Sequence, residues 1–263
     1  MSGRSAIRRE LDRLACAAQF LTRLPVPGPK AWSEELLARS ARYFPLVGLA
    51  VGGLCAAVFL LARQAWPTGV LPALLAVAAG VPLTGGFHED GLADTADGLG
   101  GGHAPEQRLA IMKDSRLGSY GALALGLVLA ARIAALAQAG GPWRAAAVLV
   151  CAHGLARAAA VVAMHLMPYA ADPAASKLKP VARDVRRHEA VIALVIGLAP
   201  LALLAPATAA VAALAGAAAA LWPALAARRL IGGYTGDVLG AVEQAFETGF
   251  LLGAAAVVGL GWA

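Results

Sequence analysis

Charged residues are scarce in this 263-residue chain: they make up 14% of it, while hydrophobic residues make up 59%. A typical soluble domain has about 25% charged residues and close to half apolar ones. So apolar a composition argues against a soluble enzyme, and it also excludes a disordered or collagen-like chain. It is typical of a membrane protein that crosses the bilayer several times.

Cysteines and basic residues are also too few to define a function. The three cysteines, Cys16, Cys55 and Cys151, are far apart and form no C-x-x-C pair, so neither a thiolate metal site nor a disulfide is predicted. Lys and Arg number 22 against 16 Asp and Glu, a net charge of +6. An excess this small gives no case for a nucleic-acid partner.

Long uncharged runs predict an all-α fold with about seven transmembrane helices, six or eight being the alternatives. A helix needs about 20 apolar residues to cross the hydrocarbon core. Such runs cover residues 44–62, 65–87, roughly 118–139 and 145–168, two spans within 190–227, and a last stretch 248–263. We expect one membrane-embedded domain, 1–263, in which small residues suit close packing of spans or of a second copy in a homo-oligomer.

Residues 1–43 form an N-terminal segment without a long apolar run. Ile7, Leu11 and Leu14 recur at helical spacing, with Arg8 and Arg9 elsewhere around the wheel. This pattern predicts a helix that lies along the membrane surface or, as an equal alternative, an exposed packing helix. Basic residues precede the first span and follow the second, fourth and sixth, so the positive-inside rule places the N-terminus and these loops in the cytoplasm.

The densest polar motif follows the second span and reads G-G-F-H-E-D-G-L-A-D-T-A-D-G-L at 85–99. In a helix Asp90, Asp94 and Asp97 share one face. Three carboxylates so placed repel one another unless a cation lies among them, and oxygen ligands suit Mg²⁺. The alternative is a solvated acidic turn. His88 lies off this face. It is a candidate base, a candidate hydrogen-bond donor to phosphate, or a structural histidine.

The segment 113–121 follows with two cations, a carboxylate and a hydroxyl: Lys113, Asp114, Ser115 and Arg116. Arg binds phosphate oxygens in pairs and Lys acts as a point charge, so these residues are suited to clamp a diphosphate. Ordinary positive charge at a cytoplasmic loop is the alternative.

A second polar stripe enters the last span. Asp237, Gly240, Gln244 and Glu247 fall on one helical face. Because Glu247 is followed by only sixteen residues, it lies at or below the interface, where an unpaired carboxylate is costly. We therefore predict a partner for it, whereas Glu243 lies off the stripe and is expected to be solvated.

Arg157 lies midway through the fourth predicted span, one turn after His153. An arginine inside a membrane needs a partner, for which we nominate Glu247 or a substrate phosphate. Arg132 is nearer the outer end of its span and is expected to extend toward the interface. Together, the carboxylates, a divalent cation and the basic residues indicate chemistry at a phosphodiester or diphosphate.

Six motifs resemble those of the cobalamin synthase (adenosylcobinamide-GDP ribazoletransferase) family. They are F-L-T-R-L-P-V-P at 20–27, R-Y-F-P-L-V-G at 42–48, the acidic run at 85–99, I-M-K-D-S-R-L-G-S-Y-G at 111–121, P-Y-A at 168–170 and G-G-Y-T-G-D at 232–237. The resemblance covers nearly the whole chain. It departs at Ala171, where the family pattern leads us to expect an arginine, although Lys177 and Lys179 follow.

The resemblance implies a bacterial inner-membrane enzyme that uses Mg²⁺ in a late step of cobalamin synthesis. It would join adenosylcobinamide-GDP to α-ribazole, or to α-ribazole 5′-phosphate, and release GMP. Asp90, Asp94 and Asp97 would hold the metal, with Asp94, Asp97 and His88 as catalytic candidates. Asp114 or Asp237 would be a further ligand or base. The expected substrate contacts are Lys113, Ser115, Arg116, Arg157, Gln244, Glu247, Arg23 and Lys177.

Other readings of the same residues remain open. A CDP-alcohol phosphotransferase or an aromatic prenyltransferase also uses aspartate-rich helices with Mg²⁺, although at other spacings and without the K-D-S-R segment. A transporter would use the intramembrane charges as an ion path, but it predicts charges along a route across the bilayer, and here the carboxylates crowd one face.

Overall fold

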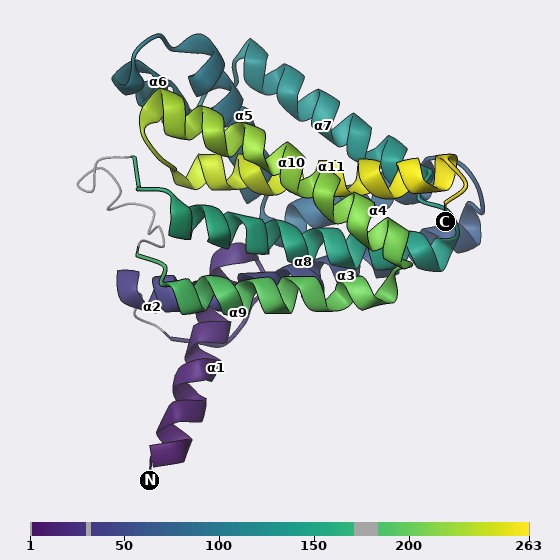
Figure 1. Cartoon of the computed structure of the whole chain (residues 1–263), viewed down its shortest axis with the longest axis horizontal. Coiled ribbons are helices and arrows are strands. Elements are labelled where there is room, and N and C mark those ends of the chain that lie inside the picture. Colours follow the sequence, from purple (N-terminus) through teal and green to yellow (C-terminus); the bar gives the residue numbers. More distant parts are fainter. Residues whose placement is uncertain (1, 30–32, 171–183, 263) are drawn as a thin grey trace.

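The computed structural model describes residues 2–29, 33–170 and 184–262, with side chains from residue 6 onward, and these parts are built from helices (Figure 1). The described residues contain no strand beyond an isolated parallel bridge between Tyr169 and Tyr234. The α-helices are α1 (Ser2–Leu21), α2 (Glu34–Ser40), α3 (Phe44–Ala65), α4 (Leu71–Thr84), α5 (Phe87–Gly101), α6 (Pro105–Met112), α7 (Ser119–Ala137), α8 (Pro142–Leu166), α9 (Arg187–Leu198), α10 (Pro206–Ile231) and α11 (Gly236–Gly259), with short 3₁₀ helices η1 (Ala41–Tyr43) and η3 (Ala199–Leu203).

The all-α membrane fold is confirmed, but the predicted count of seven spans is not. Within the described residues, five helical segments are long and apolar enough to cross a membrane, and a bent pair makes a sixth if it counts as one span. The run 65–87 yields only the 14-residue α4, which is about 21 Å long. The run 190–227 divides unequally into α9, with 12 residues, and α10, with 26.

A sharp corner separates α4 from α5, which carries the acidic motif. The two helices are bent by 91° at this break. Gly85 and Gly86 both have left-handed backbone angles, with φ of 74° and 68°, a conformation that glycine adopts without steric cost. These two glycines therefore end α4 early and send α5 across the direction of the membrane-spanning helices.

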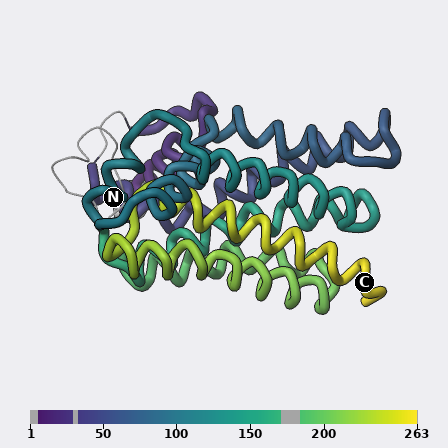
Figure 2. Tube along the Cα trace, turned by 90° about the horizontal axis from the view of Figure 1, so that it is seen from above, coloured from purple at the N-terminus to yellow at the C-terminus, as the bar shows by residue number. Residues whose placement is uncertain are grey.

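The loops and short helices that carry the motifs gather at one end of the bundle. Figures 1 and 2 show α5, α6, the end of α8, the start of α9 and the connection between α10 and α11 at this end, and the C-terminus at the other. The prediction that the polar motifs share one face of the membrane protein agrees with this arrangement.

Helix α1 extends away from the bundle, across the direction of the long helices (Figure 1). Its C-terminal half packs in the core through Cys16, Ala17 and Leu21, whereas Ile7 and Leu11 are 64% and 60% exposed. The predicted amphipathic helix is therefore present, and the described residues leave Ile7 and Leu11 of its N-terminal half uncovered.

Candidate functional site

A cavity of about 1040 Å³ opens at the end of the bundle where the motifs gather. Its walls come from the end of α1, the start of α3, α5, the segment after α6, α8 and the start of α11. The structure brings together in it ten of the residues predicted from sequence: Arg23, His88, Asp90, Asp94, Lys113, Asp114, Ser115, Arg116, Arg157 and Asp237.

Backbone contact between α5 and α11 places the two acidic segments against each other. A Cβ atom added at Gly91 would lie 2.8 Å from the backbone oxygen of Asp237, and one added at Gly240 would lie 3.0 Å from that of His88. A side chain at Gly91 would therefore clash with the backbone of α11, and one at Gly240 would be in unusually tight contact with that of α5. Asp90 and Asp94 on α5 therefore line the same cavity as Asp237 on α11.

Asp97 does not line this cavity, contrary to the prediction that three aspartates act together. It is buried, and its two carboxylate oxygens accept hydrogen bonds of 2.8 Å from the backbone amides of Gly118 and Gly121 at the start of α7. Asp97 does lie on the same side of α5 as Asp90 and Asp94, as predicted. At Asp97, however, this side of the helix contacts the start of α7 instead of the cavity. No group of three His, Cys, Asp or Glu side chains in the described residues is placed to hold a metal.

Replacing Asp97 with Asn should destabilise the fold and, if Mg²⁺ binds at Asp90 and Asp94, should leave its binding unchanged. The amide group would face a backbone N–H that now donates to a carboxylate, at an expected cost of about 1–3 kcal/mol. Thermal unfolding in detergent and the Mg²⁺ concentration for half-maximal activity measure the two effects. If stability were unchanged and a higher Mg²⁺ concentration were needed for half-maximal activity, Asp97 would be a metal ligand, as the sequence predicted.

Asp114 and Arg116 form an exposed pair in the segment after α6. The guanidinium donates to the carboxylate through Nε at 3.0 Å and Nη2 at 2.6 Å. These hydrogen bonds lower the pKa of Asp114 to about 2. A carboxylate with so low a pKa is a poor proton acceptor at neutral pH, which favours a role for Asp114 in positioning Arg116 or binding a cation over that of a base.

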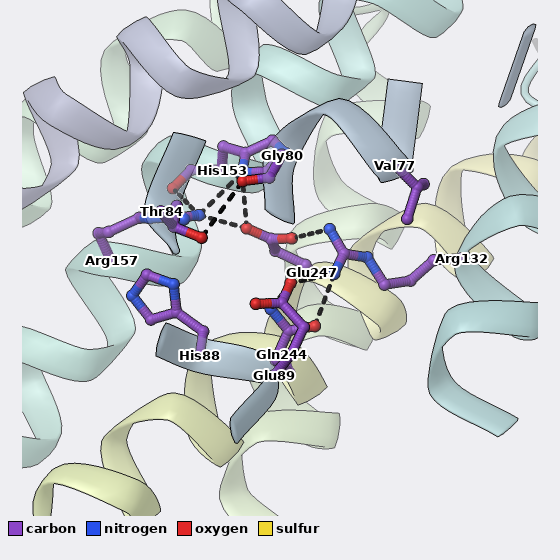
Figure 3. A pocket seen from close by; sticks show the side chains of 10 residues that line it. All are labelled: Val77, Gly80, Thr84, His88, Glu89, Arg132, His153, Arg157, Gln244 and Glu247. Carbon is purple, nitrogen blue, oxygen red and sulfur yellow. Dashed lines mark hydrogen bonds and ion pairs between the residues drawn. The ribbon is translucent and has the colours of Figure 1, made fainter. Parts of the chain in front are cut away.

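Beyond the cavity, deeper in the bundle, a buried network of charges surrounds Glu247, which is 1% exposed (Figure 3). Arg132 from α7 and Arg157 from α8 approach its carboxylate from opposite sides. Nδ1 of His153 lies 2.8 Å from Glu247 Oε1, and Arg132 Nη1 donates to Gln244 Oε1 at 2.5 Å. The predicted pairing of Arg157 with Glu247 is confirmed.

Two predictions about this region are wrong. Arg132 does not extend toward the interface: it is 3% exposed and paired with Glu247. Glu243 is not solvated either, because it is 2% exposed and pairs with Arg157 at 2.6 Å and with His88 Nε2 at 2.7 Å. Both errors have one cause, which is that α11 packs against α5, α7 and α8. Glu243 on α11 is therefore enclosed although it lies beside the predicted polar stripe, and Arg132 on α7 faces α11 and not the interface.

The network joins four helices with nearly balanced charge. Three carboxylates, from Glu89, Glu243 and Glu247, face the guanidiniums of Arg132 and Arg157. A space of only about 10 Å³ remains between these side chains. Buried charges persist when they are paired and hydrogen-bonded, so the network holds α5, α7, α8 and α11 in register.

Three other residues predicted to contact substrate divide between the inner space and the large cavity. Gln244 and Glu247 line the small inner space and not the large cavity, whereas Arg157 lines both. Lys177 lies outside the described residues. Glu89 also belongs to the network, although the sequence did not predict this. It accepts a hydrogen bond from Gln244 Nε2 at 3.2 Å. The signal available in the sequence was its position next to His88 in the acidic motif.

A helical membrane bundle whose cavity combines carboxylates with lysine and arginine side chains defines a class, that of integral-membrane enzymes built to handle phosphate groups. Within this class the chain belongs to the cobalamin-5-phosphate synthase family, whose model matches residues 13–255.

Relatives of similar length support this assignment. The chain is 46% identical over 258 residues to the adenosylcobinamide-GDP ribazoletransferase of Leptothrix cholodnii, an alignment covering 95% of this chain and 97% of the relative. It is 43% identical to the protein of the same name from Shewanella frigidimarina over 94% and 95% of the two chains. It is 42% identical to the protein of this name from Ralstonia pickettii, over 95% of this chain and 97% of the relative. No solved structure matches.

Proposed function

We propose that this protein is an adenosylcobinamide-GDP ribazoletransferase and that the large cavity holds both of its substrates. Family membership supports the reaction, and the observation that carries the site is the meeting of Asp90, Asp94 and Asp237 with Lys113 and Arg116 around one cavity. This arrangement suits a diphosphate bound through a cation on one side and basic side chains on the other.

In the proposed reaction a ribose hydroxyl of α-ribazole, or of its 5′-phosphate, attacks the phosphorus atom attached to cobinamide. A new P–O bond forms there, the P–O bond within the diphosphate breaks, and GMP leaves. The hydroxyl proton passes to a base, for which Asp237 and His88 both line the cavity. The products are adenosylcobalamin, or its 5′-phosphate, and GMP.

The residues present fit Mg²⁺, although with fewer carboxylates than the sequence predicted. Mg²⁺ is usually held by one or two carboxylates, waters and substrate phosphates. Asp90 and Asp94, one helical turn apart and both facing the cavity, provide such a pair, and Asp237 is a further candidate. Bound there, Mg²⁺ would neutralise charge on the transferring phosphoryl group and the leaving phosphate.

Basic side chains at other points of the cavity would orient the diphosphate and exclude alternative poses. Lys113 and Arg116 are exposed beside the acidic helix and would bind the GMP side, with the Ser115 hydroxyl between them. Arg157 reaches the cavity from α8 while Glu243 and Glu247 fix its position. Holding reactants in line accounts for much of the catalysis of phosphoryl transfer.

We further propose that the protein resides in the bacterial inner membrane with its N-terminus and cavity facing the cytoplasm. The basic residues before α3, on and just after α6, between α8 and α9 and in the last turn of α10 support this orientation under the positive-inside rule. It would place the site where nucleotide-linked substrates are made.

The direct test is to supply purified protein, in liposomes, with adenosylcobinamide-GDP, α-ribazole 5′-phosphate and Mg²⁺. We expect GMP and a new corrinoid in equal amounts, and no product after chelation of divalent metal. Unchanged corrinoid with folded protein would contradict the proposal and favour a phosphotransferase of the CDP-alcohol type. Movement of solute without phosphate chemistry would favour a transporter.

A further inference from the structure

Three phenylalanines form an apolar wall at the edge of the cavity, a feature to which the reaction chemistry above gives no role. Phe20 from α1 stacks on Phe44 from α3, with ring centroids 5.6 Å apart and planes at 16°. It also meets Phe87 from α5 edge to face, at 5.5 Å and 76°. All three line the cavity, and Phe20 and Phe87 are only half-buried, so part of each ring faces the cavity.

The position of this phenylalanine wall relates it to the reacting groups. Phe87 opens α5, one helical turn before Asp90, and Phe20 lies close in sequence to Arg23, which lines the same cavity. A flat ligand resting on the wall would therefore have carboxylates of α5 on one side and a guanidinium on the other. A nucleoside whose base rested on the rings would then have its sugar near the acidic helix.

We propose that the phenylalanine wall is the subsite for the benzimidazole base of α-ribazole. Aromatic side chains bind planar bases by stacking, whatever the base. Phenylalanine offers no hydrogen-bond donor or acceptor, so the wall suits a base with a weakly polar edge. Guanine, whose edge has several donors and acceptors, finds polar partners instead at Lys113, Asp114 and Ser115 elsewhere in the cavity.

This inference rests on the proposed function and specifies where one of its two substrates binds. It makes Phe20 and Phe87 determinants of affinity for the acceptor and not for the GDP-linked donor. Phe44 is 3% exposed and lies behind Phe20, so its role is to hold that ring in place.

The test is a pair of variants, Phe20→Leu and Phe87→Leu, with KM measured separately for the two substrates. Loss of a stacked ring should raise KM for α-ribazole about tenfold, while KM for adenosylcobinamide-GDP stays within about twofold. Phe20→Trp keeps an aromatic face and should stay close to wild type. Phe59→Leu is the matched control, because Phe59 is buried in α3 and does not line the cavity. Thermal unfolding confirms that each variant is folded.

Equilibrium dialysis with α-ribazole alone and with GMP alone separates this inference from the proposed reaction, because it needs no turnover. We expect Phe20→Leu to weaken α-ribazole binding about tenfold and to leave GMP binding unchanged. Weakened GMP binding with unchanged α-ribazole binding would assign the wall to guanine and overturn the inference. Unchanged binding of both in the two leucine variants would show that the rings serve packing only, and would overturn it too.

Discussion

Turnover should fall by about a thousandfold or more when Asp94 is replaced by Asn. Asp94 faces the cavity from the middle of α5. It lies between Asp90 and Asp97, whose carboxylate accepts a hydrogen bond from the start of α7. If it holds Mg²⁺ on the diphosphate, its loss removes several kcal/mol of charge stabilisation from the transition state. About 4 kcal/mol corresponds to a thousandfold in rate.

Single-turnover release of GMP, followed over a range of Mg²⁺ concentrations, measures this effect. Glu106→Gln is the matched control: Glu106 is an exposed carboxylate on the neighbouring α6 that does not line the cavity, and its loss should change the rate little. If Asp94→Asn turned over at the wild-type rate, the metal assignment on α5 would be wrong. Partial rescue by high Mg²⁺ would support it.

The largest expected loss of stability comes from replacing Glu247 with Gln. Its carboxylate is the shared partner of Arg132, Arg157 and His153, and a neutral amide would leave Arg132 with only Glu89, at 3.8 Å, and Arg157 with only Glu243, at 2.6 Å, as carboxylate partners. Breaking a buried ion pair by removing one partner costs about 3–5 kcal/mol. Because α7, α8 and α11 meet at this residue, we expect them to separate at lower denaturant concentrations.

Chemical unfolding in detergent micelles, followed by tryptophan fluorescence, gives the change in free energy. The control is Glu35→Gln, which removes a carboxylate that is 78% exposed and 3.9 Å from Arg39; exposed pairs contribute about 0–1 kcal/mol. Equal effects of the two substitutions would mean that the buried network does not stabilise the fold.

Sequence patterns predicted the helices well where a pattern depends on neighbours along the chain. Long apolar runs located α3, α7, α8, α10 and the second half of α11. The pattern failed where helix length depends on backbone geometry. Gly85 and Gly86 end α4 early, and an apolar run says nothing about the corner that they make.

The candidate site was predictable in composition and less so in arrangement. Asp90, Asp94 and Asp237 line one cavity, as their motifs indicated, since α5 and the start of α11 lie at the same end of the bundle. Asp97 shares the wheel position of Asp90 and yet binds the backbone of α7. A helical wheel gives only the direction in which a side chain leaves the helix axis. It does not show which part of the protein lies in that direction, and this changes along α5 from the cavity to α7.

Composition and motif spacing by themselves determined that this chain is a helical membrane protein and to which family it belongs, and they indicated which residue types line the cavity. These properties follow from local hydrophobicity and from short segments that are recognisable without a fold. Of the buried charge pairs, the sequence predicted that of Arg157 with Glu247, and only the tertiary structure decided the others. Arg132, Glu243 and Glu89 are far apart in sequence, and they meet because four helices enclose α11 and a buried charge requires a partner.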